Sequence, residues 1–493
     1  MGLLELLRGE AEAGRWRLAW PRPWRQPGLR RPLPLHLPAH GRGRALAPPL
    51  AALLRRPPGS WDLPELPELG GPLEPDGAVA VAQAAAAALL GAERCWFGVN
   101  GASGLLQAAL LGLADPGQRV LLPRNLHRSL LHGCLLGQLR PVLFDLPFDP
   151  ASGLWLPPSP GHLEQVLAAA LAEGPLAAVV LVSPSYQGLA GDLAGLIATA
   201  HRHGLPVLVD EAHGAHGGLA PGLPPAALAC GADLVVQSLQ KAAGGLAQSA
   251  VLLLGPRALG HSGPDPARSG PDPGRLERAL LWLQTSSPSA LLLASAEASL
   301  THLHGPGGRR HLAAALARAH RLRGRLEAAG LPLLPAQDPL RLTLCTADLG
   351  INGLAADAWL LERGVIAELP EPGCLTFCLG LNPPPGLERR LPGALLALGR
   401  ALGGAPLPPF TPPPLPLVAE PELPLGQAWR APALAAPLAE LEGRIAARPL
   451  CPYPPGIPLL IPGERIDPAR AAWLRRQVDL WPGQIADTVP VVA

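Results

Sequence analysis

Residues 206–241, PVLVDEAHGAHGGLAPGLPPAALACGADLVVQSLQK, contain two short apolar runs that each end in polar residues. The first run, residues 206–210, leads into Glu-Ala-His213, and the second, residues 234–237, leads into Ser-Leu-Gln-Lys241. Short apolar runs of this kind predict buried strands of a parallel sheet. Ligands of such sheets bind beyond the carboxyl ends of the strands. The segment therefore puts a strand-end carboxylate, a histidine and a lysine where a site is expected.

Lys241 is the only lysine among the 493 residues, because the other 39 members of the combined Lys and Arg count of 40 are arginine. Arginine replaces lysine as a surface cation but not as an amine nucleophile, since its guanidinium stays protonated in proteins. A lysine amine with a lowered pKa can condense with a carbonyl group. The count alone leaves two readings open, a leftover surface lysine or a lysine kept for covalent chemistry. The residues around Lys241 are needed to choose between these two readings.

The composition is that of a globular chain and gives no support for a nucleic-acid or membrane partner. Hydrophobic residues make up 48% of the chain, enough for a large core, and the formal net charge is only +2. No apolar stretch reaches the roughly 20 residues of a membrane-spanning helix, and acidic residues stand where a signal peptide would be apolar. The seven cysteines are scattered without a CxxC pair. We therefore expect a reduced, cytoplasmic protein with buried thiols and no metal site.

The alternation of apolar strands and helices predicts an α/β fold with a mostly parallel sheet that carries helices on both faces. A smaller α+β region is expected to follow it. We expect five units: an N-terminal arm over residues 1–60, a large α/β domain over 61–305, a small α+β domain over 306–402, a proline-rich linker over 403–420 and a C-terminal segment over 421–493.

Further polar groups follow other predicted strands. Residues 100–104 form a small-residue turn that opens a predicted helix, and His127 comes directly after another strand. Each group has an ordinary structural reading when taken singly. A strand-end carboxylate such as Asp210 is commonly a turn or capping residue, a lone histidine is commonly a hydrogen-bonded structural residue, and a small-residue turn is commonly only a turn.

Taken together, these groups meet the requirements of one cofactor, pyridoxal 5'-phosphate. This cofactor needs an amine for its aldehyde, a carboxylate for its pyridine nitrogen, a phosphate cradle and a stacking partner for its ring. Lys241 supplies the amine, Asp210 can keep the pyridine nitrogen protonated, and the imidazole of His127 can stack on the ring. The phosphate can be held by three backbone amides at a helix N-terminus, those of Ala102, Ser103 and Gly104.

An ordered set of short strings carries a family resemblance. The strings are Pro34-Leu-His-Leu-Pro-Ala-His40, Asp62-Leu-Pro-Glu-Leu-Pro67, Val99-Asn-Gly-Ala-Ser103, Arg124-Asn-Leu-His-Arg-Ser129, Ser183-Pro-Ser-Tyr-Gln-Gly188, Val209-Asp-Glu-Ala-His213, Ser238-Leu-Gln-Lys241, Gln284-Thr-Ser-Ser-Pro-Ser289 and Cys451-Pro-Tyr-Pro-Pro-Gly-Ile-Pro458. In this order they resemble the Orn/Lys/Arg decarboxylases, which have the aspartate-aminotransferase-like fold, pyridoxal-phosphate fold type I. The resemblance extends over about residues 33 to 465 and implies that residues 61–305 are the cofactor-binding domain.

The resemblance implies a role for each matching residue. The positions of Lys241, Asp210 and His127 are those of the Schiff-base lysine, the partner of the pyridine nitrogen and the ring-stacking histidine. Ala212 is expected to pack against the other face of the ring, and His213 to lie close to the cofactor. Contacts around the phosphate are expected from Ser103, Gly104 and Ser238.

Gln240 departs from the family pattern Ser-x-His-Lys. The family histidine at this position helps to hold the phosphate, whereas glutamine can donate a hydrogen bond but carries no charge and is no acid. We expect Gln240 to contact the cofactor. This departure keeps two alternatives open: another pyridoxal-phosphate reaction such as transamination, or a relative without catalytic activity.

The implied activity is decarboxylation of a basic amino acid (arginine, lysine or ornithine) to the corresponding polyamine precursor. Glu368 is a candidate acid for the distal cation of the substrate, although a solvated surface glutamate is its ordinary reading. The resemblance further implies a homodimer with the site at the interface. Within it, Thr285 and Ser286 approach the cofactor phosphate from the partner subunit.

Overall fold

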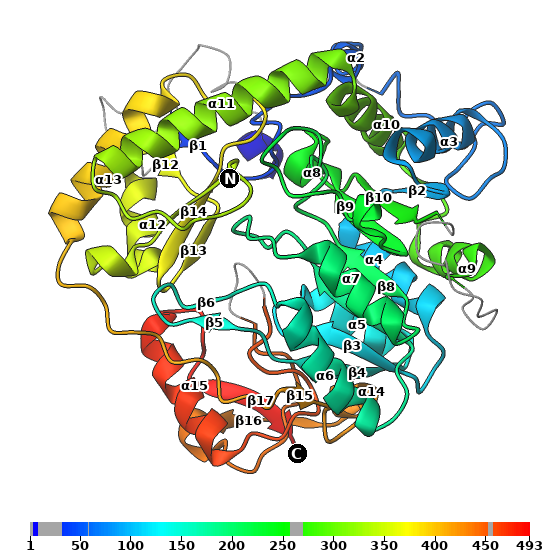
Figure 1. Cartoon of the computed structure of the whole chain (residues 1–493). Coiled ribbons are helices and arrows are strands. Elements are labelled where there is room, and N and C mark those ends of the chain that lie inside the picture. The colour runs from blue at the N-terminus through cyan, green and yellow to red at the C-terminus, as the bar shows by residue number, and fades with distance from the viewer. Residues whose placement is uncertain (1–2, 8–31, 58, 257–269, 452–456) are drawn as a thin grey trace.

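A computed structural model describes residues 3–7, 32–57, 59–256, 270–451 and 457–493 (Figure 1). Most of the first half of the expected N-terminal arm therefore lies outside the described residues. The same holds for residues 452–456 of the Cys451–Pro458 string.

The large domain is built on an eight-stranded sheet with the spatial order β15-β4-β3-β7-β8-β9-β10-β2 (Figure 1). In chain order its strands are β2 (Arg94–Gly98), β3 (Arg119–Pro123), β4 (Arg140–Phe144), β7 (Ala178–Val182), β8 (Val207–Asp210), β9 (Leu234–Ser238), β10 (Ala250–Leu254) and β15 (Val418–Ala419). β10 and β15 run antiparallel to their neighbours, and the other six strands share one direction. The predicted α/β class with a mostly parallel sheet is confirmed.

Both faces of this sheet are buried because successive side chains of each strand point to opposite sides. In β8, Val207 and Val209 pack into one core cluster while Leu208 packs into the other. The first cluster includes α3 (Ala78–Leu90), α6 (Pro160–Ala172), α7 (Leu193–Arg202) and α10 (Ala290–His304). The second includes α4 (Gly101–Leu113), α5 (Arg128–Leu136) and α9 (Pro273–Leu283).

A smaller α+β unit follows α10, and the long helix α11 leads into it (Figure 1). Its three-stranded antiparallel sheet has the order β11-β14-β13. Its elements are α11 (Pro306–Ala328), β11 (Arg341–Leu344), η2 (Ala347–Leu349), α12 (Gly353–Glu362), β12 (Val365–Ile366), β13 (Leu369–Glu371), β14 (Cys374–Cys378) and α13 (Leu387–Leu402). The N-terminal arm docks here, because β1 (Leu33–Pro34) pairs in parallel with β12.

The end of the chain returns to the large domain. Val418 and Ala419, in the segment predicted as a linker, form strand β15 at the edge of the large sheet. The other elements of this part are α14 (Leu425–Arg430), β16 (Ala433–Pro437), η3 (Leu438–Glu440), α15 (Pro468–Leu480) and β17 (Thr488–Val492). A buried ion pair joins the two parts: the carboxylate of Glu464 lies 2.5 Å from Arg124 and 3.2 Å from Arg470.

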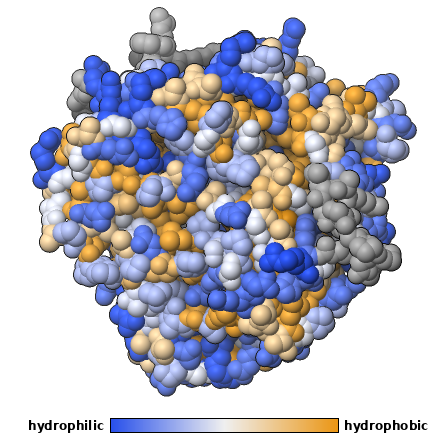
Figure 2. All heavy atoms as spheres, in the orientation of Figure 1, coloured by the Kyte–Doolittle hydropathy of each residue, from blue (hydrophilic) through white to orange (hydrophobic). Residues whose placement is uncertain are grey.

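Five further elements are short: α2 (Pro48–Leu53), the paired strands β5 (Phe148–Asp149) and β6 (Leu154–Trp155), η1 (Leu228–Cys230) and α8 (Leu239–Ala242). None of the described helices has both the length and the apolar character needed to cross a membrane. On the face in Figure 2, hydrophobic and hydrophilic residues are interspersed, as is usual for folded proteins.

Candidate active site

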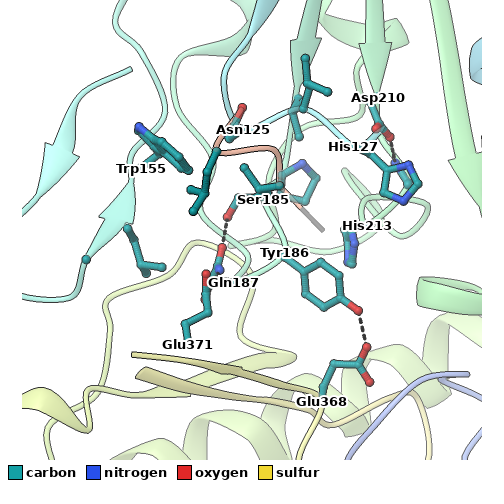
Figure 3. Close-up of a pocket in the computed structure, with 18 of the residues that line it drawn as sticks. Asn125, His127, Trp155, Ser185, Tyr186, Gln187, Asp210, His213, Glu368 and Glu371 are labelled. Carbon is teal, nitrogen blue, oxygen red and sulfur yellow. Dashed lines mark hydrogen bonds between the residues drawn. The ribbon is translucent and has the colours of Figure 1, made fainter. Parts of the chain in front are cut away.

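A cavity of about 490 Å³ lies beyond the carboxyl ends of the parallel strands (Figure 3). Its size is in the range of roughly 300–1,000 Å³ that is usual for small-molecule sites. We call the side formed by residues at or after the carboxyl ends of the large-domain strands the sheet wall; it includes Ser103, His127, Asp210, Ser238 and Lys241. We call the opposite side the facing wall; it includes Trp155, Glu368, Glu371, Phe410 and Trp473.

The structure brings nine of the ten predicted cofactor-binding residues to the cavity: Ala102, Ser103, His127, Asp210, Ala212, His213, Ser238, Gln240 and Lys241. The tenth, Gly104, does not line it. A Cβ atom at position 104 would lie 3.2 Å from Asn100 Nδ2, so this glycine permits close packing of the turn that precedes α4. Thr285 and Ser286 are exposed and do not line the cavity of their own chain.

Lys241 reaches the cavity from α8, the single helical turn that follows β9. Its Nζ lies 3.0 Å from Nε2 of His213. Burial lowers the pKa of the Lys241 amine, and the charge of Asp210 opposes this shift. Because a lower pKa leaves more of the amine unprotonated, the environment favours a nucleophilic lysine.

Asp210 ends β8 and is only 5% exposed. Its Oδ1 accepts a hydrogen bond from the backbone N–H of Ala212 at 3.1 Å, and the carboxylate forms no ion pair with the described residues. Burial raises the pKa of this carboxyl, while the charge of Lys241 lowers it. A buried carboxylate without a cation is unfavourable, so the position suits a ligand that presents a protonated nitrogen.

His127 caps the N-terminus of α5, where its Nδ1 accepts from the backbone N–H of Ser129 at 3.3 Å. Burial, followed by the charge of Lys241, lowers the pKa of His127 to about 4. The imidazole is therefore neutral at physiological pH, with its proton on Nε2. A flat, uncharged ring on the sheet wall is suited to stacking against an aromatic ligand.

The start of α4 is suited to an anion. The N-cap residue Asn100 makes no capping hydrogen bond with its side chain, and Gly101, at φ 67°, takes a backbone conformation that L-residues rarely adopt. The first amides of a helix lack intrahelical acceptors and carry the positive end of the helix dipole. Ala102 and Ser103 bring this helix end to the cavity, where Ser238 and Gln240 add polar side chains. This arrangement can hold a phosphate group.

On the facing wall, both oxygens of Glu368 are already engaged. One accepts a hydrogen bond from the hydroxyl of Tyr186, and the other accepts from the backbone N–H of Leu37 at 2.7 Å. The ring of Tyr186 lies 4.2 Å from the His213 ring, centroid to centroid (Figure 3). Glu368, the candidate acid from the sequence, lines the cavity. However, its bonds fix the arm and Tyr186 rather than leave an oxygen free.

Glu371 is a second acid of the facing wall, and the sequence reading did not single it out. Its Oε2 accepts from Nε2 of Gln187 at 2.6 Å, whereas its Oε1 forms no hydrogen bond with the described residues. The residue is only 7% exposed, and burial raises the pKa of its carboxyl to about 7. Figure 3 shows it on the far side of the cavity from Asp210. It can accept a cationic group from a ligand.

Aromatic residues from three distant segments cover the rest of the facing wall: Trp155 of β6, Phe410 of the segment after α13, and Trp473 of α15. Trp473 is fixed by a hydrogen bond from its indole N–H to the carbonyl of Thr411 at 2.9 Å. Within the described residues, no group of three or more His, Cys, Asp or Glu side chains is arranged to hold a metal ion.

Comparisons with known proteins agree on one family. Residues 60–338 match the major domain of the Orn/Lys/Arg decarboxylases, and residues 418–477 match their C-terminal domain. Arginine decarboxylase of Halalkalibacterium halodurans is 29% identical over 465 residues, which cover 90% of each chain. Arginine decarboxylase of Bacillus subtilis is also 29% identical, over 471 residues and 91% of each chain.

Among solved structures, lysine decarboxylase A from Pseudomonas aeruginosa superposes with a TM-score of 0.72 at 20% identity. The superposition covers 98% of this chain and 79% of that chain. A serine palmitoyltransferase with pyridoxal phosphate gives a TM-score of 0.51 at 21% identity over 66% of this chain and 77% of that chain. At these identities the likeness concerns the fold. It agrees with the predicted fold type.

Proposed function

The chain belongs to the Orn/Lys/Arg decarboxylase family, and as an amino-acid decarboxylase it is a carbon–carbon lyase. We propose that it decarboxylates a basic amino acid with pyridoxal 5'-phosphate as cofactor. Arginine stands first among the candidate substrates, supported by the names of the relatives that are 29% identical to this chain. The product would be the corresponding amine, a polyamine precursor.

One observation carries this proposal: the only lysine amine of the protein shares a cavity with a buried carboxylate that forms no ion pair with any described residue. Lys241 would bind the aldehyde of the cofactor, and Asp210 would hold a proton on the pyridine nitrogen. His127 and Ala212 would lie against the two faces of the ring. The phosphate would be held by the amides of the α4 N-terminus with Ser103, Ser238 and Gln240. These residue types match the cofactor group by group.

When bound, pyridoxal phosphate supplies an electron sink for the electrons that the departing carboxylate leaves on the α-carbon. The chain supplies orientation and proton transfer. Asp210 would keep the ring nitrogen protonated, because its buried carboxylate forms no ion pair with a described residue and only the charge of Lys241 partly offsets its burial. Lys241 and His213, whose nitrogens lie 3.0 Å apart, are the two candidates to return a proton to the α-carbon. The aromatic side chains of the facing wall exclude water.

The carboxylates of the facing wall support a basic substrate. Glu368 is occupied by Tyr186 and Leu37, whereas Glu371 keeps one oxygen without a hydrogen bond to the described residues. We propose that Glu371, oriented by Gln187, accepts the distal ammonium or guanidinium of the substrate. A cation there would also offset the burial that now raises the pKa of the Glu371 carboxyl to about 7.

Release of carbon dioxide from carboxyl-labelled amino acids tests the function directly. Arginine, lysine and ornithine would each be compared with citrulline, a neutral isostere of arginine. We expect labelled gas from at least one basic substrate and little from citrulline. Formation of a keto acid without labelled gas would instead support transamination. A colourless protein that acts on none of the substrates would support the reading as a non-catalytic relative.

We propose that the protein acts as a homodimer in the cytoplasm. Next to the exposed residues Thr285 and Ser286, helix α9 exposes Leu281 and Trp282, the latter 77% exposed. Large apolar side chains of this kind suit a subunit interface. All seven cysteines are free, as in proteins of reducing compartments. We further propose that the chain divides into the five units expected from its sequence, with boundaries at 1–60, 61–305, 306–402, 403–420 and 421–493.

A further inference from the structure

A buried arginine lies directly behind the lysine of the cavity. Arg341 begins β11 of the small unit and is 1% exposed, yet it does not line the cavity. One of its terminal nitrogens, Nη2, donates to the carbonyl of Lys241 at 3.1 Å. The same nitrogen lies 3.5 Å from Nδ1 of His213, whose Nε2 is 3.0 Å from the Lys241 amine. Arg341, His213 and Lys241 therefore form one line of contacts.

The donors along this line fix where the protons are. A guanidinium only donates hydrogen bonds, so Nδ1 of His213, which faces Arg341, must present its lone pair. A neutral imidazole then carries its proton on Nε2, the nitrogen that faces the amine of Lys241. An N–H at this point needs an acceptor, and an ammonium group offers none. The contact at 3.0 Å is favourable only when Lys241 is a neutral amine.

We propose that Arg341 is a positioning residue that acts through His213 to hold the Lys241 amine in its neutral, nucleophilic form. The inference rests on the proposed role of Lys241 as the amine that binds the cofactor. Arg341 would then influence the chemistry of the site although it does not line the cavity.

The charge of Arg341 points in the same direction. Arg341 forms no salt bridge with a described residue, and its Nε has no hydrogen-bond partner among them. Against the effect of burial, the charges of Asp338 and Glu368 stabilise the guanidinium from further away and raise its pKa. The nearby carboxylate of Asp338 is engaged instead by His216 at 3.1 Å and by the backbone N–H of Leu340. The guanidinium therefore disfavours a second positive charge on Lys241.

The space for this arginine is built into the backbone. Gly188, at φ 82°, lies so close that an added Cβ atom would be 2.8 Å from the Cβ of Arg341. A glycine is thus needed both for its conformation and for the approach of the Arg341 stem.

Several other groups surround the amine and the imidazole. Asp210, Glu368 and Cys378 raise the pKa of Lys241, in opposition to burial and to Arg341. Burial and the charges of Lys241, Arg341, His127 and His216 all lower the pKa of His213, which keeps its ring neutral. Tyr186 packs against the His213 ring. The pKa of Lys241 is thus set by groups that raise it and groups that lower it. Loss of Arg341 removes one of those that lower it, and so favours the charged form of Lys241.

The single lysine makes this balance measurable without turnover. The full chain, freed of any cofactor by hydroxylamine and dialysis, would be treated at a series of pH values with limiting acetic anhydride, which acylates only unprotonated amines. Labelling of the Lys241 peptide would be read by mass spectrometry. For the wild type we expect half-maximal labelling below pH 10.5, the ordinary lysine value. A wild-type curve at the ordinary value would overturn the inference without any variant.

Two variants of similar size separate charge from packing. R341M removes both the charge and the donors, and we expect its labelling curve to move up by about one pH unit, or about tenfold less labelling at pH 8. R341K keeps a cation and should stay close to the wild type. An unchanged curve for R341M contradicts the proposal. So does a curve for R341K that follows R341M, because a positive charge at this position would then make no difference to Lys241.

R119M is the matched control, since Arg119 is also buried but begins β3 at the opposite end of the sheet, where it pairs with Glu420 at 2.5 Å. Its Lys241 curve should coincide with the wild type. Because the labelling needs neither cofactor nor substrate, its outcome is separate from that of the decarboxylation assay. An inactive protein with the expected curves refutes the proposed function and not this inference, and an active protein with unshifted curves does the reverse.

Discussion

The two walls of the cavity are built in different ways. On the sheet wall, Asp210 ends β8 and Lys241 lies three residues after β9, so these neighbouring strands bring the two residues together. The facing wall combines the β5–β6 hairpin, the segment around β13, the chain after α13 and helix α15, which are far apart in the sequence (Figure 1). The difference suggests a division of labour. The sheet wall provides groups for cofactor chemistry, and the facing wall provides a cation acceptor and aromatic cover for the substrate.

The largest effect is expected from the amine of the sheet wall. Lys241→Ala should lower decarboxylation by about four orders of magnitude, as for residues that act as one unit with the rest of a site. Lys241→Arg should do the same, because a guanidinium keeps the charge but is no nucleophile. Labelled carbon dioxide release and the visible absorbance of the cofactor measure both. An active arginine variant would mean that the charge and not the amine matters.

A smaller but still large effect is expected from the buried carboxylate of the sheet wall. Asp210→Asn should lower kcat about 10²–10³-fold, since it removes a fixed charge from the reacting system. Asp233→Asn is the control. Asp233 precedes β9 at the other end of the sheet and bonds to His201 and to the backbone N–H of Val207. This control should change stability rather than kcat. Equal losses of kcat in the two variants would contradict the assignment of Asp210.

For the facing wall, we expect an effect on binding instead of on kcat. Glu371→Gln should raise KM for the basic substrate about ten- to a hundredfold, the usual worth of a hydrogen bond to a charged group. Glu211→Gln is a matched control. Burial raises the pKa of Glu211 to about 7 as well, and a glutamine, Gln237, also donates to it, but Glu211 does not line the cavity.

The same carboxyl predicts a pH dependence. Below its pKa of about 7, Glu371 is mostly neutral and binds a cation weakly; above it, the carboxylate binds strongly. In the wild type, KM should therefore fall as the pH rises through about 7. This inflection should disappear in Glu371→Gln and persist in Glu211→Gln. A profile that keeps its inflection in Glu371→Gln would remove Glu371 from the substrate site.

The smallest effect concerns the departure from the family pattern on the sheet wall. Gln240→His restores a ring that can carry a positive charge, so cofactor affinity should rise about fivefold, because charge-assisted hydrogen bonds are stronger than neutral ones. The measurement is the concentration of pyridoxal phosphate that half-restores the visible absorbance of cofactor-free protein. Unchanged affinity would mean that Gln240 already serves the phosphate as well as histidine does.

The residues of the sheet wall could be predicted from the sequence more readily than those of the facing wall. Asp210, His127 and Lys241 could be found because a strand end and the residues that follow it are local in the sequence. Gly104 was expected at the cavity because it stands in the helix-opening turn. The sequence does not reveal that the absence of a side chain at Gly104 leaves room for the side chain of Asn100.

Glu371 and Arg341 could not be found in this way. Glu371 lies on β13 and acquires its role from Gln187, a residue almost two hundred positions earlier. Arg341 is one of 39 arginines, and nothing local distinguishes it from a surface residue. The sequence pointed to these two residues only through their neighbours. Gln187, which bonds to Glu371, and Gly188, which lies against Arg341, both stand in the family-like string Ser183–Gly188. The strand β15 was missed because two residues in a proline-rich stretch carry no alternation pattern.

Borohydride reduction of the protein incubated with pyridoxal phosphate is the most direct test of the central claim that Lys241 holds the cofactor. The account predicts that reduction fixes the cofactor permanently to one peptide, the one that contains residue 241, and that Lys241→Ala yields no labelled peptide. Attachment of the cofactor elsewhere, or a wild-type protein that remains unlabelled at saturating cofactor, would contradict it.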